Sequence, residues 1–201
     1  MTFPTRQAWA VASIVLLLSS CAKRGFDRDR FIGSSFTLVE GGSSGWSEIR
    51  GEVMTVLITL DPECPFCLGY APVIDSLEER YRDRGVRFVG LYPAGFIHTD
   101  SAARFARTSG FDFPQVMDAD CSLALALRAR VTPECFVLDA DARMIYHGAV
   151  DNWAVRAGRH KSRATKHYLA DALDAATMGR PLEQVELTAV GCIVECDGLN
   201  E

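Results

Sequence analysis

The sequence VMTVLITLDPECPFC, residues Val53–Cys67, carries a predicted strand directly into a pair of cysteines. Its first part, Val53–Leu60, is a continuous apolar run rich in β-branched residues, a pattern typical of a strand buried on both faces of a sheet. Cys64 and Cys67 follow at positions i and i+3. Apolar side chains then recur at helical spacing as far as about Arg84, so the cysteines are predicted to lie at the start of a helix.

Strand and helix patterns alternate along the rest of the chain. The predicted strands are Val86–Tyr92, Phe113–Met117, Cys135–Leu138 and Met144–Val150, and the predicted helices are Thr99–Ser109, Ser122–Ala129 and one that begins near Tyr168 and closes at Gly179. The order β-α-β-α-β-α-β-β-α predicts an α/β fold. Its central sheet is parallel for the most part, becomes mixed through the late hairpin, and is flanked by helices.

The composition favours one globular domain of ordinary size. The chain has 201 residues, of which 48% are hydrophobic, and its formal net charge is −5. This content is too apolar and too weakly charged for a disordered chain. The acidic balance also argues against a nucleic-acid partner, because such binding depends on neutralising phosphates with basic residues.

The N-terminus resembles a bacterial lipoprotein signal. Arg6 precedes an apolar run, Ala8–Leu18, that is about half as long as a membrane-spanning helix requires. Small residues lead from this run to Cys21, as in the lipobox, where the cysteine is acylated after cleavage. A plain secretory signal is the alternative. Lipidation of Cys21 would anchor the protein to a membrane in the periplasm, and the outer membrane is favoured because Ala22 follows the cysteine.

These features divide the chain into four predicted parts. Residues 1–20 are a signal peptide, residues 21–34 a polar tether, residues 35–196 the folded domain, and residues 197–201 a C-terminal tail. The signal peptide implies export to the periplasm, an oxidising compartment in which the remaining cysteines can form disulfides.

Cys64 and Cys67 have the spacing of a redox-active pair. Cys64 precedes the free N–H groups of the first helical turn, where the helix dipole favours a thiolate. The thiolate is the attacking species in disulfide exchange, so Cys64 is predicted to be the exposed nucleophile and Cys67 the more buried resolving thiol. A structural disulfide is an alternative. A metal site is disfavoured because a second CxxC and paired histidines at ligand spacing are missing, and no cofactor is predicted.

The segment Cys64–Cys67 resembles the active site of the thioredoxin superfamily, in the extracytoplasmic branch of TlpA- and ResA-type thiol-disulfide oxidoreductases with a redoxin domain. Pro72 matches the proline of the active-site helix, and Thr132-Pro133 matches the cis-proline loop. The separation of these motifs fits the strand–helix insertion of that group, here roughly Gly90 to Met117. The resemblance implies a thioredoxin-like fold over about residues 35–195.

The C-terminal part carries a narrower resemblance. The segments Gly148–Trp153, His167–Ala175 and Val190–Ile193 resemble those of a group of secreted bacterial redoxin-domain proteins. This likeness supports the fold, and it supports function only as a class.

The resemblance also implies roles for residues near the cysteine pair. Thr132 and Pro133 would pack beside it and bind the backbone of a substrate, and Pro65 and Phe66 would contact that substrate. Glu134 would accept a proton near Cys67, although a surface carboxylate without a role is an equal alternative.

Two positions depart from the superfamily pattern. Glu63 stands where thioredoxins usually have tryptophan, and its charge should oppose thiolate formation at Cys64. Ile58 stands where thioredoxin has a buried aspartate that assists proton transfer, which is why Glu134 is considered for that task.

The function implied is exchange of protein disulfides in the cell envelope, with protein thiols as substrates and an upstream thiol-disulfide reductant or oxidant as partner. A thiol peroxidase is the first alternative, but Leu57 and Asp61 replace the proline and threonine of its usual motif. Arg128 or Arg130 could supply the arginine that a peroxidatic site needs. The second alternative is a binding module, for metal handling or envelope structure, with a structural disulfide.

Four further cysteines have no pairing that the sequence can fix. Cys121, Cys135, Cys192 and Cys196 permit three full pairings. Cys135 is predicted to be a small buried core residue. Cys192 and Cys196 would be roughly 13 Å apart in an extended chain, too far to bond to each other. Cys192 has the better claim to a function because it belongs to the family-like C-terminal segment.

Overall fold

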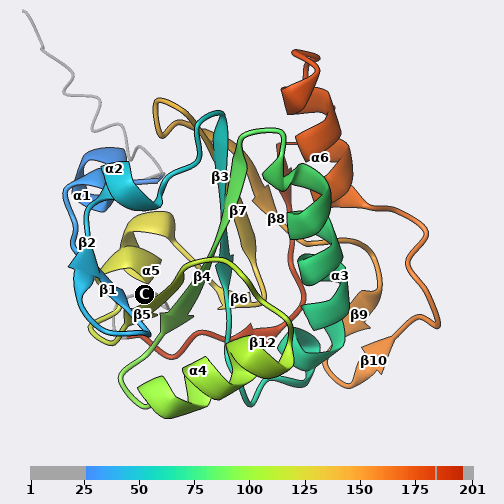
Figure 1. Cartoon of the computed structure of the whole chain (residues 1–201). Coiled ribbons are helices and arrows are strands. Elements are labelled where there is room, and N and C mark those ends of the chain that lie inside the picture. Colours follow the sequence, from blue (N-terminus) through green and yellow to red (C-terminus); the bar gives the residue numbers. More distant parts are fainter. Residues whose placement is uncertain (1–25, 184, 197–201) are drawn as a thin grey trace, which may run out of the picture.

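The computed structural model describes residues 26–183 and 185–196 as one α/β domain (Figure 1). The strands are β1 (Phe36–Leu38), β2 (Ser43–Ser44), β3 (Met54–Thr59), β4 (Val86–Pro93), β5 (Gln115–Asp118), β6 (Val131–Thr132), β7 (Cys135–Asp139), β8 (Met144–Gly148), β9 (Ala154–Arg156), β10 (Arg159–His160), β11 (Glu186–Leu187) and β12 (Cys192–Ile193). The helices are α1 (Arg28–Ile32), α2 (Trp46–Ile49), α3 (Pro65–Arg82), α4 (Thr99–Thr108), α5 (Ser122–Leu127) and α6 (Tyr168–Thr177).

The main sheet is mixed, as the strand order predicts. Its eight strands run in the order β11-β8-β7-β3-β4-β5-β1-β2. β3 pairs in parallel with β4 and antiparallel with β7, which in turn forms a hairpin with β8. All six residues of β3 are buried, which explains why its sequence is continuously apolar.

Helices cover both faces of this sheet. α3 and α6 lie on one side in Figure 1, and α1, α2 and α5 lie on the other. Successive residues of β3 point to opposite faces: Val56 and Ile58 join the core under α3, and Leu57 joins the core under α5. The predicted thioredoxin-like arrangement is confirmed. The stretch in which the strand–helix insertion was expected, roughly Gly90 to Met117, holds the end of β4, α4 and most of β5.

The predicted tether is wrong for its second half. Phe31 of α1 is fully buried, and its ring lies 5.4 Å from that of Phe36 and 5.5 Å from that of Trp46. Asp27 caps the helix by accepting a hydrogen bond from the Arg30 backbone N–H. Burying one large aromatic side chain stabilises a fold by about 2 kcal/mol, so this short segment belongs to the domain despite its charged residues.

Several short elements were not predicted from the sequence. β9 and β10 form a small hairpin between Ala154 and His160. More important for the site, β12 pairs antiparallel with β6. The predicted signal peptide, Cys21 and the 197–201 tail lie outside the described residues. Within the part that the structure describes, none of the helices has the length and apolarity needed to cross a membrane.

Candidate functional site

The site is built where β3 ends and α3 begins. Cys64 is the N-cap of α3 and Pro65 is its first residue, where a missing N–H has no intrahelical partner to lose. Asp61 shapes the turn, since its carboxylate accepts from the Glu63 N–H (2.8 Å) and its carbonyl from the Cys64 N–H (3.1 Å). α3 then runs without interruption through Pro72.

The loop that contains Thr132 and Pro133 lies against this turn. The peptide bond between these residues is cis, as the resemblance implies. Thr59, at the end of β3, holds the loop: its hydroxyl donates to the Val131 carbonyl (2.7 Å) and accepts from the Glu134 N–H (2.9 Å). The Thr132 carbonyl oxygen lies 3.1 Å from Cys64 Sγ. Both Thr132 and Pro133 are buried.

Cys64 is bonded to Cys192, and not to Cys67 as the spacing suggested. The Cα atoms of Cys64 and Cys192 are 6.0 Å apart, although 128 positions separate them in the sequence. The expected exposure of Cys64 is also wrong, because the residue is only 1% exposed. The reason is the C-terminal segment, in which Cys192 pairs with Thr132 and Ile193 with Val131. That pairing brings Cys192 Sγ onto Cys64.

A second disulfide joins Cys121 to Cys196 and anchors the same segment. Cys121 precedes α5 in a left-handed backbone conformation (φ 60°). Of the four cysteines left open by the sequence, Cys135 remains unpaired and fully buried, which confirms its assignment to the core. Cys192 and Cys196 bond to different partners, as their separation requires.

Cys67 is a fully buried free thiol. Burial raises its pKa to about 12, although the Asp61 N–H donates to its sulfur (3.4 Å) and the Thr132 hydroxyl also favours the thiolate. The Thr132 hydroxyl has no well-formed hydrogen bond among the described residues. Cys67 is therefore protonated at neutral pH and is a weak nucleophile while the segment is closed.

Glu134 is fully buried but faces other partners than Cys67. Its carboxylate accepts from the Arg130 backbone N–H (2.6 Å) and contacts His147 Nε2 (2.7 Å). Burial would raise its pKa, but these hydrogen bonds and the nearby charges outweigh burial and hold the pKa below its usual range. Glu134 thus stabilises the loop around Thr132 and Pro133 through its contacts with Arg130 and His147. These contacts give no support to a proton-accepting role at Cys67. The carboxylate that lies near Cys67 belongs to Asp61.

Trp153 is a site neighbour that the sequence analysis did not single out. Its ring packs edge-on against Tyr70 (5.0 Å between centroids) and Phe66 (6.4 Å). A side chain at Gly69 would overlap the Trp153 ring, which explains a glycine inside α3. Asp151 fixes the arrangement by accepting from the Tyr70 hydroxyl (2.9 Å) and from the Trp153 backbone N–H (2.7 Å).

This packing also bears on the two residues between the cysteines. Phe66 is 8% exposed, which leaves Pro65 as the accessible residue of the pair expected to contact substrate. The motif Gly148–Trp153 therefore supports the first turns of α3.

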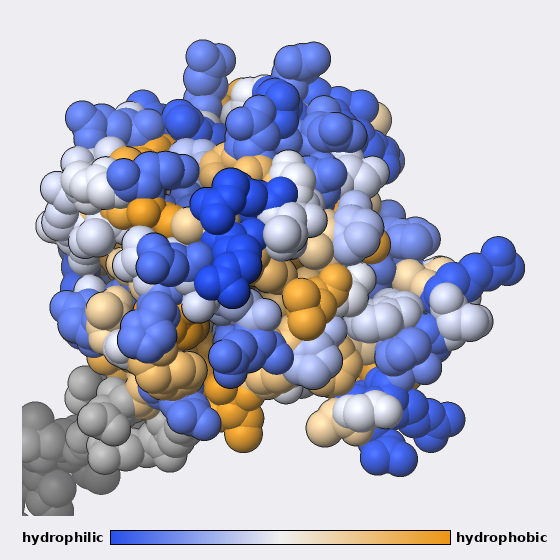
Figure 2. Space-filling model, turned by 60° about the horizontal axis from the view of Figure 1, so that its bottom comes forward, coloured by the Kyte–Doolittle hydropathy of each residue, from blue (hydrophilic) through white to orange (hydrophobic). Residues whose placement is uncertain are grey.

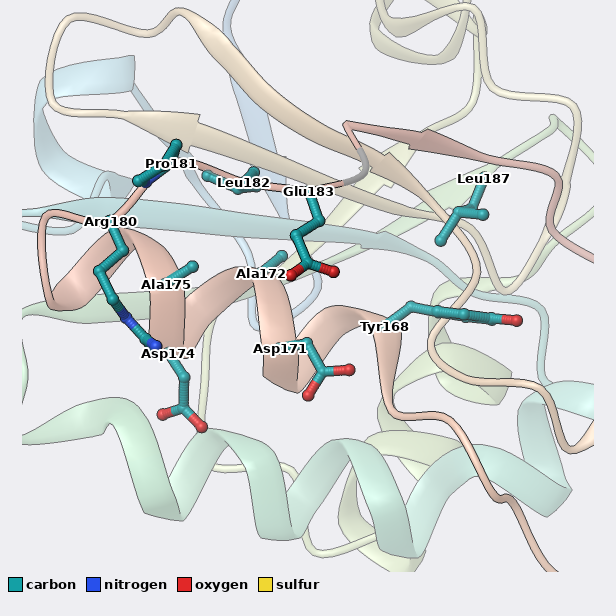
Figure 3. Close-up of a pocket in the computed structure, with 10 residues that line it drawn as sticks. All are labelled: Tyr168, Asp171, Ala172, Asp174, Ala175, Arg180, Pro181, Leu182, Glu183 and Leu187. Carbon is teal, nitrogen blue, oxygen red and sulfur yellow. The ribbon is translucent and has the colours of Figure 1, made fainter.

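The other features considered from the sequence lie apart from the sulfurs. Arg130 is exposed and pairs with Glu134 (3.4 Å), so it is not directed at Cys64, and Arg128 is also exposed. A cavity of about 530 Å³ lies between α6 and the segment after it, lined by Asp171, Asp174 and Arg180 among others (Figure 3). It contains no cysteine. Residues 26–183 and 185–196 include no cluster of three potential metal-ligating side chains.

The fold and the site define a thioredoxin-like protein with a cysteine at the start of its principal helix. A family model described as Redoxin matches residues 33–158. The chain belongs to the Redoxin family. This membership supports a thiol-redox role.

Solved structures show the same fold at low sequence identity. A hypothetical protein from Sinorhizobium meliloti 1021 is 22% identical, with a TM-score of 0.73 over 82% of this chain and 91% of its own. An uncharacterized conserved protein from Geobacillus kaustophilus is 22% identical, with a TM-score of 0.71 over 82% of this chain and 88% of its own.

A secreted disulfide oxidoreductase from Mycobacterium tuberculosis, homologous to E. coli DsbE, is 18% identical, with a TM-score of 0.54 over 75% of this chain and 98% of its own. No curated protein matches the sequence. These likenesses establish the fold, and the chemistry must be argued from the site itself.

Proposed function

We propose that this protein is a thiol-disulfide oxidoreductase that acts on protein disulfides in the cell envelope. Cys64 is the exchanging sulfur, and Cys67, one helical turn further on, is its resolving thiol once the site is open. Val131 and Thr132 form the edge on which the strand carrying the other sulfur pairs, and Pro133 follows them through a cis peptide bond. Protein thiols are the substrates, and an envelope reductant or oxidant renews the redox state.

One observation carries this proposal: Cys64 is disulfide-bonded to a cysteine on an extended segment whose backbone pairs with Thr132. Exchange with a protein requires this arrangement, because a polypeptide has to be held in extended form while its sulfur reaches Cys64. The site accommodates such a strand with backbone hydrogen bonds, which do not depend on its sequence. The disulfide is also placed at the start of a helix of 18 residues, whose dipole stabilises Cys64 as a leaving thiolate.

The location is proposed on the sequence alone. A signal peptide over residues 1–20 and acylation of Cys21 would hold the domain at a membrane surface in the periplasm, and the outer membrane is favoured because Ala22 follows the cysteine. There, disulfides form and persist, and a disulfide-exchanging protein has substrates. Labelling of cells with a fatty-acid analogue, followed by mass spectrometry of the N-terminal peptide, tests the anchor.

Reduction of insulin by dithiothreitol tests the activity. The wild-type chain should accelerate precipitation of the insulin B chain, and Cys64→Ser should reduce this acceleration to background. Equal activity of Cys64→Ser and the wild type would refute the proposal. Rapid consumption of hydrogen peroxide with little insulin reduction would favour the peroxidase. A Cys64–Cys192 bond that resists mild reductant, with neither activity, would favour the binding module.

A further inference from the structure

Cys64 lies at the start of α3, but the cysteine that reacts first with an outside partner need not be Cys64. We propose that Cys192 is a third redox-active cysteine, which passes electrons between Cys64 and a protein partner. This inference rests on the proposed function and names the route by which it works. It makes the C-terminal segment, residues 190–196, an internal substrate of the site.

Access to the sulfurs favours this route. Cys64 is 1% exposed and Cys67 is fully buried, whereas Cys192 is partly exposed at the protein surface. Thiol-disulfide exchange requires the incoming sulfur to approach one sulfur of the bond. Cys192 is the more exposed residue of the bond, so we expect an outside thiol to approach the bond from the Cys192 side.

The segment is built to hold Cys192 in this place. The Val194 N–H donates to the Arg130 carbonyl (3.0 Å) and extends the pairing with β6, and the Val194 side chain is 3% exposed. Gly191 passes so close to the loop that a Cβ there would overlap the Thr132 backbone. The bond from Cys196 to Cys121 fixes the far end. These contacts together hold Cys192 against Cys64.

The first half-reaction consumes a protein disulfide. In the reduced chain, the Cys192 thiolate attacks one sulfur of that disulfide, the substrate bond breaks, and its other sulfur leaves as a thiolate. Cys64 then attacks Cys192 Sγ, which releases the second substrate thiolate and forms the Cys64–Cys192 bond present in the structure. Two electrons move from Cys64 and Cys192 to the substrate, which takes up two protons.

The second half-reaction returns these electrons from a dithiol partner. One thiolate of the partner attacks Cys192 Sγ, and Cys64 leaves as a thiolate at the start of α3. The second partner thiol attacks the mixed disulfide, releases Cys192 and closes the partner's own disulfide. Cys67 can also attack Cys64 Sγ and release Cys192. This step moves the disulfide to Cys64–Cys67 and leaves the chain oxidised, so the dithiol partner must still reduce the Cys64–Cys67 bond by the same exchange.

Exposed apolar side chains accompany both sulfur-bearing elements. Leu68, next to Cys67 on α3, is 55% exposed, and Ile193, next to Cys192, is 69% exposed. Figure 2 turns the lower side of Figure 1 forward, the side on which β12 and the start of α3 lie, and apolar residues are interspersed there among polar ones. A folded or partly folded protein fits such a surface better than a small charged thiol does.

Mapping of the mixed disulfide tests the route in the oxidised full-length chain. Reduced glutathione is added briefly, the reaction is stopped with acid, free thiols are alkylated, and peptides are sequenced by mass spectrometry. We expect glutathione on Cys192 and the alkyl group on Cys64. Glutathione on Cys64 with Cys192 alkylated would overturn the inference.

Turnover separates this inference from the proposed function. In the insulin assay, Cys192→Ser should be slower than the wild type by about tenfold or more, and the control Cys135→Ala should stay within about twofold of it. Wild-type or faster turnover of Cys192→Ser would show that the segment only covers the site. If Cys64→Ser is inactive in that same experiment, the proposed function stands while the relay fails. If Cys64→Ser is fully active, the proposed function itself fails.

Discussion

Two disulfides join the same C-terminal segment to the domain, but their surroundings differ. Cys64 is the N-cap of an 18-residue helix, beside the Thr132 carbonyl, and its bond ends on a partly exposed Cys192. Cys121 precedes a helix of only six residues, and both it and Cys196 are buried. A leaving sulfur at a helix N-terminus and an accessible partner sulfur favour exchange of a disulfide, and burial of both cysteines hinders it. The first bond is thus suited to exchange and the second to anchoring.

The sharpest way to probe this difference is the pH dependence of the step in which Cys67 replaces Cys192. Burial raises the pKa of Cys67 to about 12, so its thiolate fraction should rise tenfold per pH unit below that value. Release of Cys192, followed by alkylation in excess reagent and mass spectrometry, should therefore accelerate by about a thousandfold between pH 7 and pH 10. The Cys121–Cys196 bond, which has no free thiol of this kind beside it in the described chain, should show no such gain. A flat profile would contradict the assignment.

Removal of each bond in turn should separate activity from stability. Cys64→Ser should lower insulin reduction by about a hundredfold or more, because it removes the exchanging sulfur. The double variant Cys121→Ser, Cys196→Ser should keep turnover within about threefold, yet lose about 4 kcal/mol of unfolding free energy through loss of a long closed loop. Urea unfolding followed by circular dichroism measures the second effect. Loss of turnover in the double variant would mean that pairing with β6 does not hold Cys192 at Cys64 without the second bond.

Gly191→Ala tests whether close backbone approach holds Cys192 in place. The added Cβ would overlap the Thr132 backbone and loosen the pairing of β12 with β6. The Cys64–Cys192 bond should then be reduced by glutathione about tenfold faster, because access improves. Gly45→Ala is the matched control, since a Cβ there meets only Ser47 Oγ at 3.9 Å. Equal reduction rates in the two variants would argue that Gly191 has no such role.

Glu134→Gln should have the smallest effect, on the loop beside the exchanging bond. The amide keeps the shape but loses charge-assisted bonds with the Arg130 N–H and His147, at a cost of about 1–3 kcal/mol. Because the folded-state pKa of Glu134 lies below its unfolded value, the carboxylate stabilises the fold above the unfolded pKa. This contribution disappears as the pH falls through the folded-state pKa, so wild type and variant should converge in acid. Stability that differs equally at every pH would contradict this reading.

The sequence predicted the elements with strong periodicity and missed those stabilised by distant contacts. The strand within Val53–Leu60 and the helix α3 could be predicted, because a buried strand has a continuous apolar run and a half-buried helix has apolar residues at helical spacing. α1 has one fully buried aromatic residue among charged ones, and β12 has two residues. Neither segment has a periodic apolar pattern, so neither element could be predicted from the sequence. Both are stabilised by contacts with residues far away in the chain.

The site was predicted in the same uneven way. Cys64, Thr132 and Pro133 were brought together correctly, since local spacing and a known motif mark them. The predicted pairing of Cys64 with Cys67 was wrong, because cysteine spacing indicates only pairs that are close in the sequence, and Cys192 lies 128 positions away. The glycine before Cys192 was the available signal: a backbone that passes so near another needs a residue without a Cβ.

The position of the Cys121–Cys196 bond sets a geometric limit on Cys192. Four peptide units join Cys192 to Cys196, and an extended chain spans at most about 3.6 Å per residue. While that anchor is intact, the Cα of Cys192 can travel no further than roughly 14 Å from the Cα of Cys196. Under the proposed relay, a partner would therefore have to bring its own sulfur to the surface of this domain, and a disulfide recessed in a rigid protein would be out of range. The limited reach of Cys192 therefore favours partners whose disulfides lie on protruding or unfolded segments.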